Sequence, residues 1–446
     1  MPTSGFDTYY GDNPWSGLSA NQRSWYVPDL LDVFRAKAVY NQFVPMKVDL
    51  AAQRTGLMVF NLVYDMEPNT DAIGLRDLWL PSAYTDSASL TIGMEHYGDK
   101  VSLHKYDEMI TYWRQNGRVG LRPIIRDKIA ISMTETMDIL ARNAFLTAPY
   151  AIYAASGTGT LFSGIAATDV FDADTIKDIW LGLSYRDVPL AQNPSGGTNG
   201  ALVAIASPGV IYDIQNNKSE WLDILKYADI SRALRYEVGT IYNARFLSTT
   251  RNTLWNCGAI VTQKTITSAV QPGAGAARTV DTVYTVGQSD ATTYIQLNSV
   301  AGLEVNDVVT IHTVRTNDFG VTNGVDYRSG KNTVRRIVSI DTVNNRISLD
   351  KPVMKEYTTD LGGGVYGYVT KGRHIHATIF LAGPNGVVAG VAQPPEFHEA
   401  PVVDDLMAMY RFSWDSYMKY QVFRPEVFEV VFSAGSVRMK GDVVNQ

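Results

Sequence analysis

The sequence has almost no cysteine, no long apolar run and no cluster of basic residues. Cys257 is the single cysteine among 446 residues, which excludes an intrachain disulfide and a cysteine-rich metal site. No apolar stretch reaches the roughly 18 residues that a membrane-spanning helix needs. The opening MPTSGFDTYYGDNPW has neither the basic nor the apolar region of a signal peptide. We therefore expect no membrane partner and a protein that is made and kept in a cytoplasm.

Acidic residues outnumber basic ones, 45 to 39, and the formal net charge is -6. A dedicated nucleic-acid-binding protein carries a basic stripe, and no such stripe is present here. Tyrosine is abundant, at 25 residues. Its ring is apolar while its hydroxyl forms hydrogen bonds, which suits extensive subunit contacts and equally suits ordinary β-rich packing.

One long amphipathic helix is predicted from about Pro123 to Thr147, with Pro149 closing its far end. A rod of about 24 residues at 1.5 Å per residue would be roughly 36 Å long. An ordinary α/β domain could contain a core helix with the same pattern. The apolar residues recur at steps of three and four on one face: Ile125, Ile129, Met133, Met137, Leu140 and Ala144.

Two segments before the helix are apolar without forming compact elements. The opening residues are rich in Gly, Asn, Pro and Ser and read as an extended arm with aromatic anchors. Residues 66–85 form a long excursion between strands predicted at 57–65 and 87–107. An excursion this apolar needs a partner surface. The candidate assembly-contact residues in these two segments are Trp15, Trp25, Tyr26, Ile73, Leu75, Leu78, Trp79 and Leu80.

The region after the helix is mixed α/β and is interrupted by a stretch with only strand patterns, from about Ile260 to Val369. Apolar residues alternate or cluster there between Asn, Asp and Gly turns, and Asn344–Asn345 is expected to turn a hairpin. This stretch predicts a small β-barrel or a β-sandwich.

Three motifs follow one another in the region after the helix: GALVAIASPGVIYDI, EWLDILKYAD and VGTIYNARFLSTT. The last contains Gly239, Ile241, Arg245 and Phe246 at fixed spacing. Upstream lies TIGMEHYGDKVSLHKYDEM, and near the end lie HIHATIFLAGPNGVVAGV and WDSYMKYQVFRPEVFEVVFSAG. Together, over roughly residues 85–255 and 373–435, they resemble the major capsid proteins of tailed phages. The most similar family that we identify is the one typified by the podovirus N-four.

The resemblance implies an α+β fold of the Hong Kong 97-like capsid type with an inserted all-β domain. Its implied parts are an N-terminal arm (1–54), an extended loop (55–95), a peripheral domain with the spine helix (96–155, with return strands near 400–435), the first part of the axial domain (156–259), an inserted β-barrel or sandwich domain (260–372), and an axial and peripheral return with the C-terminal segment (373–446).

The function implied by the resemblance is a major capsid protein of the virion, assembled in the bacterial host cytoplasm through hexamers and pentamers into an icosahedral head shell. The implied partners are copies of itself, a scaffolding protein, a portal and a cement or decoration protein. Packaged double-stranded DNA would be enclosed without sequence-specific binding. Some capsid proteins of this fold form an isopeptide bond from a lysine of the extended loop, and residues 66–85 contain no lysine. A head decoration or tail protein, or an enzyme with an accessory β-module, stay as alternatives.

Motifs for catalysis or cofactor binding are weak. Residues 329–332 (SGKN) carry Asn where a P-loop needs Ser or Thr. His374, His376, His398 and Glu399 could bracket a metal ion, but no cysteine or further carboxylate completes a ligand set. We therefore expect no catalytic residues, no cofactor and no metal, and a protein that is not an enzyme.

Overall fold

The computed structural model describes residues 38–48, 57–63, 87–105, 121–147, 149–154, 164–186, 188, 202–217, 222–223, 236–252, 254–270, 294–313, 333–350, 353, 357–383, 385–400 and 409–436. Strands dominate, and the helices are few, which agrees with the predicted α+β class. None of the described helices is both long enough and apolar enough to cross a bilayer.

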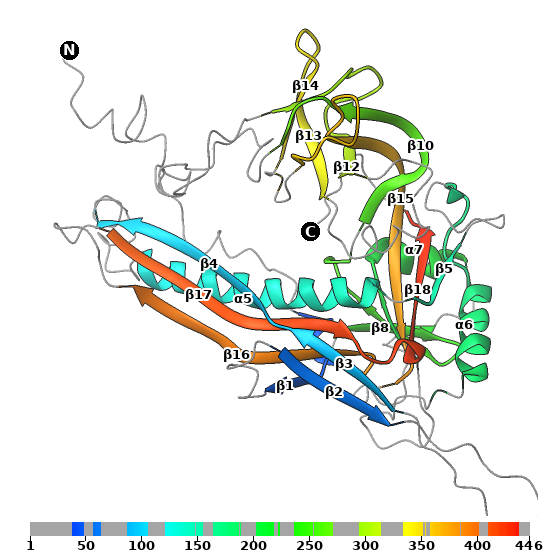
Figure 1. Cartoon of the computed structure of the whole chain (residues 1–446). Helices are drawn as coiled ribbons and strands as arrows, with labels where there is room; N and C mark the ends of the chain where they lie inside the picture. Colours follow the sequence, from blue (N-terminus) through cyan, green and yellow to red (C-terminus); the bar gives the residue numbers. More distant parts are fainter. Residues whose placement is uncertain are drawn as a thin grey trace, which may run out of the picture.

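A four-stranded sheet lies along one long helix, α5 (Leu121–Leu146) (Figure 1). The sheet has the order β1-β16-β17-β4, in which only the β1–β16 pair is parallel. Its strands are β1 (Met46–Val48), β16 (Val387–Ala400), β17 (Met409–Val422) and β4 (Glu95–His104). The long helix predicted from Pro123 to Thr147 is confirmed, with bounds that differ by one or two residues.

The predicted apolar face of α5 is the face that packs. Ile125, Ile129 and Met133 in its first half contact a cluster with Leu103 of β4 and Trp414 of β17. Residues of its second half join a larger core cluster instead: Met137, Leu140 and Ala144. One stripe of the helix therefore spans two cores.

A two-stranded antiparallel ribbon, β2 (Leu57–Val63) with β3 (Ser87–Gly93), precedes β4. Met58, Phe60 and Ile92 on one face pack against residues of β16. On the opposite face Leu57 is 52% exposed and Val59 is 57% exposed. The predicted strand at 57–65 and the two strands predicted within 87–107 are confirmed as β2, β3 and β4.

The long strand β15 (Gly367–Leu381) runs from the strands β10 and β12 to β18 and β6 (Figure 1). It pairs with β18 (Phe428–Ala434) on one side and with β6 (Leu202–Ala206) on the other, and β6 runs parallel to β9 (Ala244–Ser248). The sheet continues through β8 and β7, and β5 pairs with β18. The remaining bounds are β5 (Ala151–Tyr153), β7 (Leu222–Asp223), β8 (Glu237–Ile241), α6 (Ala173–Tyr185) and α7 (Pro208–Asn217).

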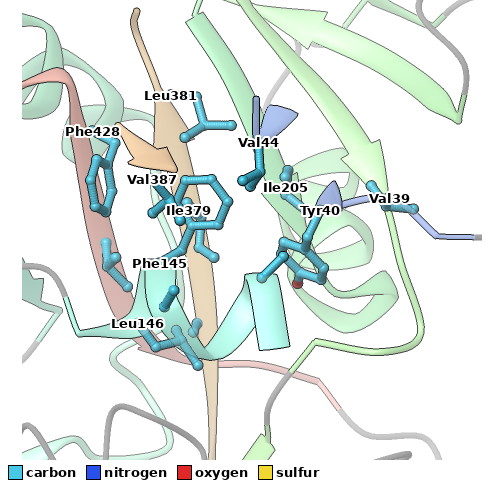
Figure 2. Close-up of a cluster of buried hydrophobic side chains, with 14 of the residues drawn as sticks. Val39, Tyr40, Val44, Phe145, Leu146, Ile205, Ile379, Leu381, Val387 and Phe428 are labelled. Carbon is cyan, nitrogen blue, oxygen red and sulfur yellow. The ribbon is translucent and has the colours of Figure 1, made fainter. Parts of the chain in front are cut away.

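Every residue of β6 is buried, because the sheet is covered on both faces. Phe171 and residues of α6 and α7 cover one face. The other face packs against the C-terminal end of α5, and Figure 2 shows Phe145, Ile205, Ile379 and Phe428 meeting there. The motif GALVAIASPGVIYDI thus supplies a buried strand followed by a helix that begins at Pro208.

The strands from β10 to β15 close into a small barrel. The pairing order is β10-β15-β12-β13-β14-β11, and two backbone hydrogen bonds, Thr267 N to Gln296 O (3.1 Å) and Asn298 N to Thr265 O (3.0 Å), join β11 to the end of β10. Among the described residues, fourteen buried side chains fill the interior. The turn between β13 and β14 contains Asn345 at φ 52, so the predicted hairpin is confirmed. The bounds are β10 (Leu254–Ile266), β11 (Ile295–Gln296), β12 (Val308–His312), β13 (Thr333–Asp341) and β14 (Arg346–Leu349).

Candidate functional site

The first described residues form a short segment, residues 38–44, which we call the arm root. It contains the single turn η2 (Asn41–Phe43) and lies against the C-terminal half of α5. Val39, Tyr40 and Val44 are buried in the same cluster as Phe145 and Leu146 of that helix (Figure 2). The arm root is thus part of the folded core.

A single carboxylate oxygen holds the backbone of the arm root. Asp138 Oδ1 accepts hydrogen bonds from the amides of Val39 (2.9 Å), Tyr40 (2.8 Å) and Asn41 (3.1 Å). The start of a helical turn leaves its backbone amides without partners, and a charged acceptor satisfies them strongly. Because Asp138 is fully buried, these bonds do not compete with bulk water.

Two buried arginines extend this network to the connection after β9. Arg251 donates to Glu135 Oε1 (2.9 Å) and its Nη1 lies 3.8 Å from Asp138 Oδ2. Arg142 Nη1 donates to the carbonyl of Arg251 (2.7 Å). Burial raises the pKa of Asp138, while the arm-root amides and Arg251 oppose that shift. Burial lowers the pKa of Arg142 to about 10.

Strands of the four-stranded sheet hold the arm root from its other side. Tyr420 of β17 donates its hydroxyl hydrogen to Asn41 Oδ1 (3.0 Å), and Ala389 N of β16 donates to Pro45 O (3.2 Å). The helix and the sheet therefore both hold the arm root in place.

Asp138 and Arg142 were not identified from the sequence as part of a site. Both lie off the apolar stripe of α5, where charged side chains usually face solvent, yet they are 0% and 1% exposed. Their one local signal is the i, i+4 spacing of opposite charges beside the apolar end of the helix. The amides bound by Asp138 lie 97 to 99 residues earlier in the chain, which no local pattern reveals.

The eight predicted assembly-contact residues stand outside the described residues, so the structure does not place them. They are Trp15, Trp25, Tyr26, Ile73, Leu75, Leu78, Trp79 and Leu80.

The four residues considered as metal ligands do not converge. His376 on β15 contacts Ser207, with 2.6 Å between Nδ1 and Oγ, while Glu399 on β16 pairs with Arg126 of α5. Within the part of the chain that the structure describes, no group of three metal-ligating side chains could hold an ion.

The second pair of strand histidines belongs to the face of the four-stranded sheet that points away from α5. His398 Nε2 lies 2.6 Å from Asp415 Oδ1, and His96 Nε2 lies 3.3 Å from Asp415 Oδ2. His96 also stacks on Tyr417, with ring centroids 4.3 Å apart. These contacts link β4, β17 and β16 across the exposed sheet face and explain both histidines structurally.

No protein-family model matches this sequence, and no curated protein matches it. Solved structures do match. The capsid of Ralstonia phage GP4 aligns over 93% of this chain and 95% of its own chain, at 9% identity and a TM-score of 0.55. The capsid of cyanophage P-SCSP1u covers 93% of each chain at 8% identity and a TM-score of 0.47.

The head structure of Helicobacter pylori bacteriophage KHP40 also aligns, over 96% of this chain and 97% of its own, at 10% identity and a TM-score of 0.47. The assignment of the fold depends on the likeness to the capsid of Ralstonia phage GP4. The chain therefore has a fold similar to that of a phage capsid protein.

Proposed function

We propose that this chain is the major capsid protein of a tailed double-stranded DNA phage and assembles through hexamers and pentamers into an icosahedral head shell. The observation that carries the proposal is the fold likeness to the Ralstonia phage GP4 capsid, which spans 93% of this chain. Because the likeness extends nearly from end to end, it includes α5, the four-stranded sheet and the central sheet together. The ordered motifs in the sequence support the same function independently, and they favour the family typified by the podovirus N-four.

The proposal divides the chain into the parts of the Hong Kong 97-like fold. The peripheral domain is α5 with the four-stranded sheet, and the axial domain is the central sheet with α6 and α7. The β2–β3 ribbon is the base of the extended loop, and the arm root is the end of the N-terminal arm. The barrel is an inserted all-β domain, which has its own buried core.

Contacts between copies are the basis of the proposed shell. The ribbon presents Leu57 and Val59 to solvent, both more than half exposed, and its opposite end, at Val63 and Ser87, leads into the apolar excursion at residues 66–85. A contact between two different surfaces of identical subunits closes into a ring when the rotation between them permits. We propose that the ribbon face and the excursion together cover a neighbouring copy.

The other proposed partners are a separate scaffolding protein, a portal and a cement or decoration protein. The packaged DNA is enclosed without sequence-specific binding, in keeping with a net charge of -6. The proposed place of the protein is the virion, after assembly in the bacterial host cytoplasm. A non-enzymatic role is proposed because the capsid fold provides contact surfaces.

Expression of the full chain, followed by sedimentation and negative-stain electron microscopy, tests this function. We expect closed polyhedral particles, or free hexameric and pentameric rings, alone or after co-expression with the scaffolding protein of the same phage. A trimer or ring that never closes would favour a decoration or tail protein. A monomer under all of these conditions would overturn the proposal.

A double substitution tests the role of the ribbon face within that function. Leu57→Ser with Val59→Ser changes two side chains that point to solvent, so we expect a folded subunit with an unchanged circular dichroism spectrum. Shell yield should fall at least several-fold. Val343→Ser is the matched control, because Val343 is 87% exposed in the β13–β14 turn and should leave the yield unchanged. Equal yields from the two variants would remove the ribbon face from the contact.

A further inference from the structure

A buried histidine joins the C-terminal end of β18 to the start of α7. His376 on β15 is 6% exposed, and its Nδ1 lies 2.6 Å from Ser207 Oγ, at the point where β6 ends and α7 begins. The same strand position pairs with Leu254 of β10 and with Ser433 of β18. Three segments that are distant in sequence therefore meet at one ring.

Two residues after β18 lie directly on this ring and on α7. Ser436 N donates to Asp213 Oδ2 (2.8 Å), and the hydroxyl of Ser436 hydrogen-bonds to the other oxygen of Asp213. We call Ser207, Asp213, His376, Gly435 and Ser436 the C-terminal clasp. It is built from β6, α7, β15 and the segment after β18.

Two glycines allow the chain to approach this closely. A methyl group added at Gly435 would stand 2.4 Å from Cδ2 and 2.7 Å from Nε2 of His376. One added at Gly209 would meet the carbonyl oxygen of Ser436 at 2.4 Å. Neither glycine position has room for a side chain, because the backbone of Gly435 packs on the His376 ring and the backbone of Ser436 packs on the start of α7. A shift of the ring or of the helix would therefore disrupt these backbone contacts.

Burial of the ring favours its neutral form. Ser207 Oγ, which also accepts weakly from Val210 N (3.5 Å) as the cap of α7, lies at hydrogen-bond distance from Nδ1. Burial lowers the pKa of His376 to about 3, and the neighbouring His374 acts in the same direction, while the Gly435 backbone opposes the shift. The imidazole of His376 is therefore neutral when the clasp is closed.

We propose that the C-terminal clasp is an acid-sensitive joint, in which protonation of His376 releases Gly435 and Ser436 from β15 and α7. A buried imidazolium is costly unless a carboxylate reaches it. The helix α7 carries the carboxylate of Asp213, but both oxygens of that carboxylate already accept hydrogen bonds from Ser436. The other groups next to the ring in the part of the chain that the structure describes are His374 on β15, Ser207 before α7 and Ser433 on β18, and none of these three is an anion.

The direction of the pH dependence follows from linkage. The ring in an open clasp is solvated and takes up a proton near pH 6.5, whereas the ring in the closed clasp resists protonation until a much lower pH. The closed state thus keeps its full stability above about pH 6.5 and loses it as the pH falls toward 3. The equilibrium constant for opening should rise about tenfold for each pH unit in that window.

Hydrogen exchange of the full chain between pH 7 and pH 4, corrected for intrinsic exchange, measures this opening. We expect peptides that cover residues 207–214 and 428–436 to lose protection as the pH falls, while the barrel strands β13 and β14 stay protected. Loss of protection in the barrel at the same pH would show global unfolding and would overturn the proposal.

Three variants distinguish the effect of protonating His376 from other effects of low pH on the protein. His376→Gln cannot be protonated, so its acid response in these peptides should disappear. Ser207→Ala removes the hydrogen bond to Nδ1 in the closed clasp and should therefore move the opening to a higher pH. His398→Gln, which changes an exposed strand histidine, should behave as the unchanged protein. An equal acid response of the His376→Gln variant would overturn the proposal; where that variant does not fold, an unshifted opening in Ser207→Ala would do so. Neither outcome depends on whether the chain builds a shell.

Discussion

The two halves of α5 pack in different ways, although the helix is continuous. The first half buries a single stripe, including Ile129, against the four-stranded sheet and leaves Arg126 and Lys128 on its exposed side. The second half is enclosed on several sides, and even the charged side chains of Asp138 and Arg142 are buried from solvent. The change occurs where the arm root crosses the helix.

This difference shows how a surface helix becomes a core helix without a change in its apolar stripe. In the first half the polar side faces solvent, as in any amphipathic helix. In the second half the polar side faces the amides of the arm root and the guanidinium of Arg251. The buried charges are tolerated because each one has a fixed polar partner.

Removal of the buried carboxylate should have the largest effect. Asp138→Ala leaves three amides of the arm root without their acceptor and leaves Arg251 with Glu135 as its remaining ion-pair partner, which should lower the free energy of unfolding by about 4 kcal/mol. Urea unfolding followed by circular dichroism measures the loss. Asp138→Asn keeps one oxygen acceptor and should lose less. A loss below about 1 kcal/mol for Asp138→Ala would contradict the role of the network.

A core truncation in the first half should cost less. Ile129 is 3% exposed, but several of its neighbours on the helix are only half-buried and can move into the space that Ile129→Ala leaves. We expect a loss of about 3 kcal/mol by the same urea assay. A loss larger than that of Asp138→Ala would reverse the comparison between the two halves.

The exposed side of the first half should contribute least. Arg126 forms an ion pair with Glu399, and its guanidinium lies 5.8 Å from the ring centroid of Phe412, but its side chain is 49% exposed. Water and salt screen such a pair, so Arg126→Ala should cost less than about 1 kcal/mol. The cost should shrink further in 0.5 M salt, and a cost that is independent of salt would argue against screening.

Local patterns predicted much of the fold. The steps of four between Ile125, Ile129 and Met133 predicted the packing face of α5, because burial on one stripe depends on helical period alone. Alternation and Asn-rich turns predicted the strands of the barrel and the turn at Asn345. The choice between barrel and sandwich required the pairing of β10 with β11, which alternation does not specify.

The site could not be predicted in the same way. The partners of Asp138 and of His376 come from segments about 98 and 169 residues away, so only the folded chain brings them together. A charged residue such as Asp138 is expected to face solvent, but the packing of the folded chain buries its side chain. The ordered motifs predicted a capsid protein, and the fold likeness supports that prediction, while the predicted contact residues in the arm and the excursion stay predictions.

A cryo-electron microscopy reconstruction of particles assembled from the full chain tests the central claim most directly. The account predicts a closed icosahedral shell in which Asp138 Oδ1 accepts the amides of residues 39–41 from its own chain. An open or irregular assembly, or an arm root docked on the Asp138 of another copy, would contradict it.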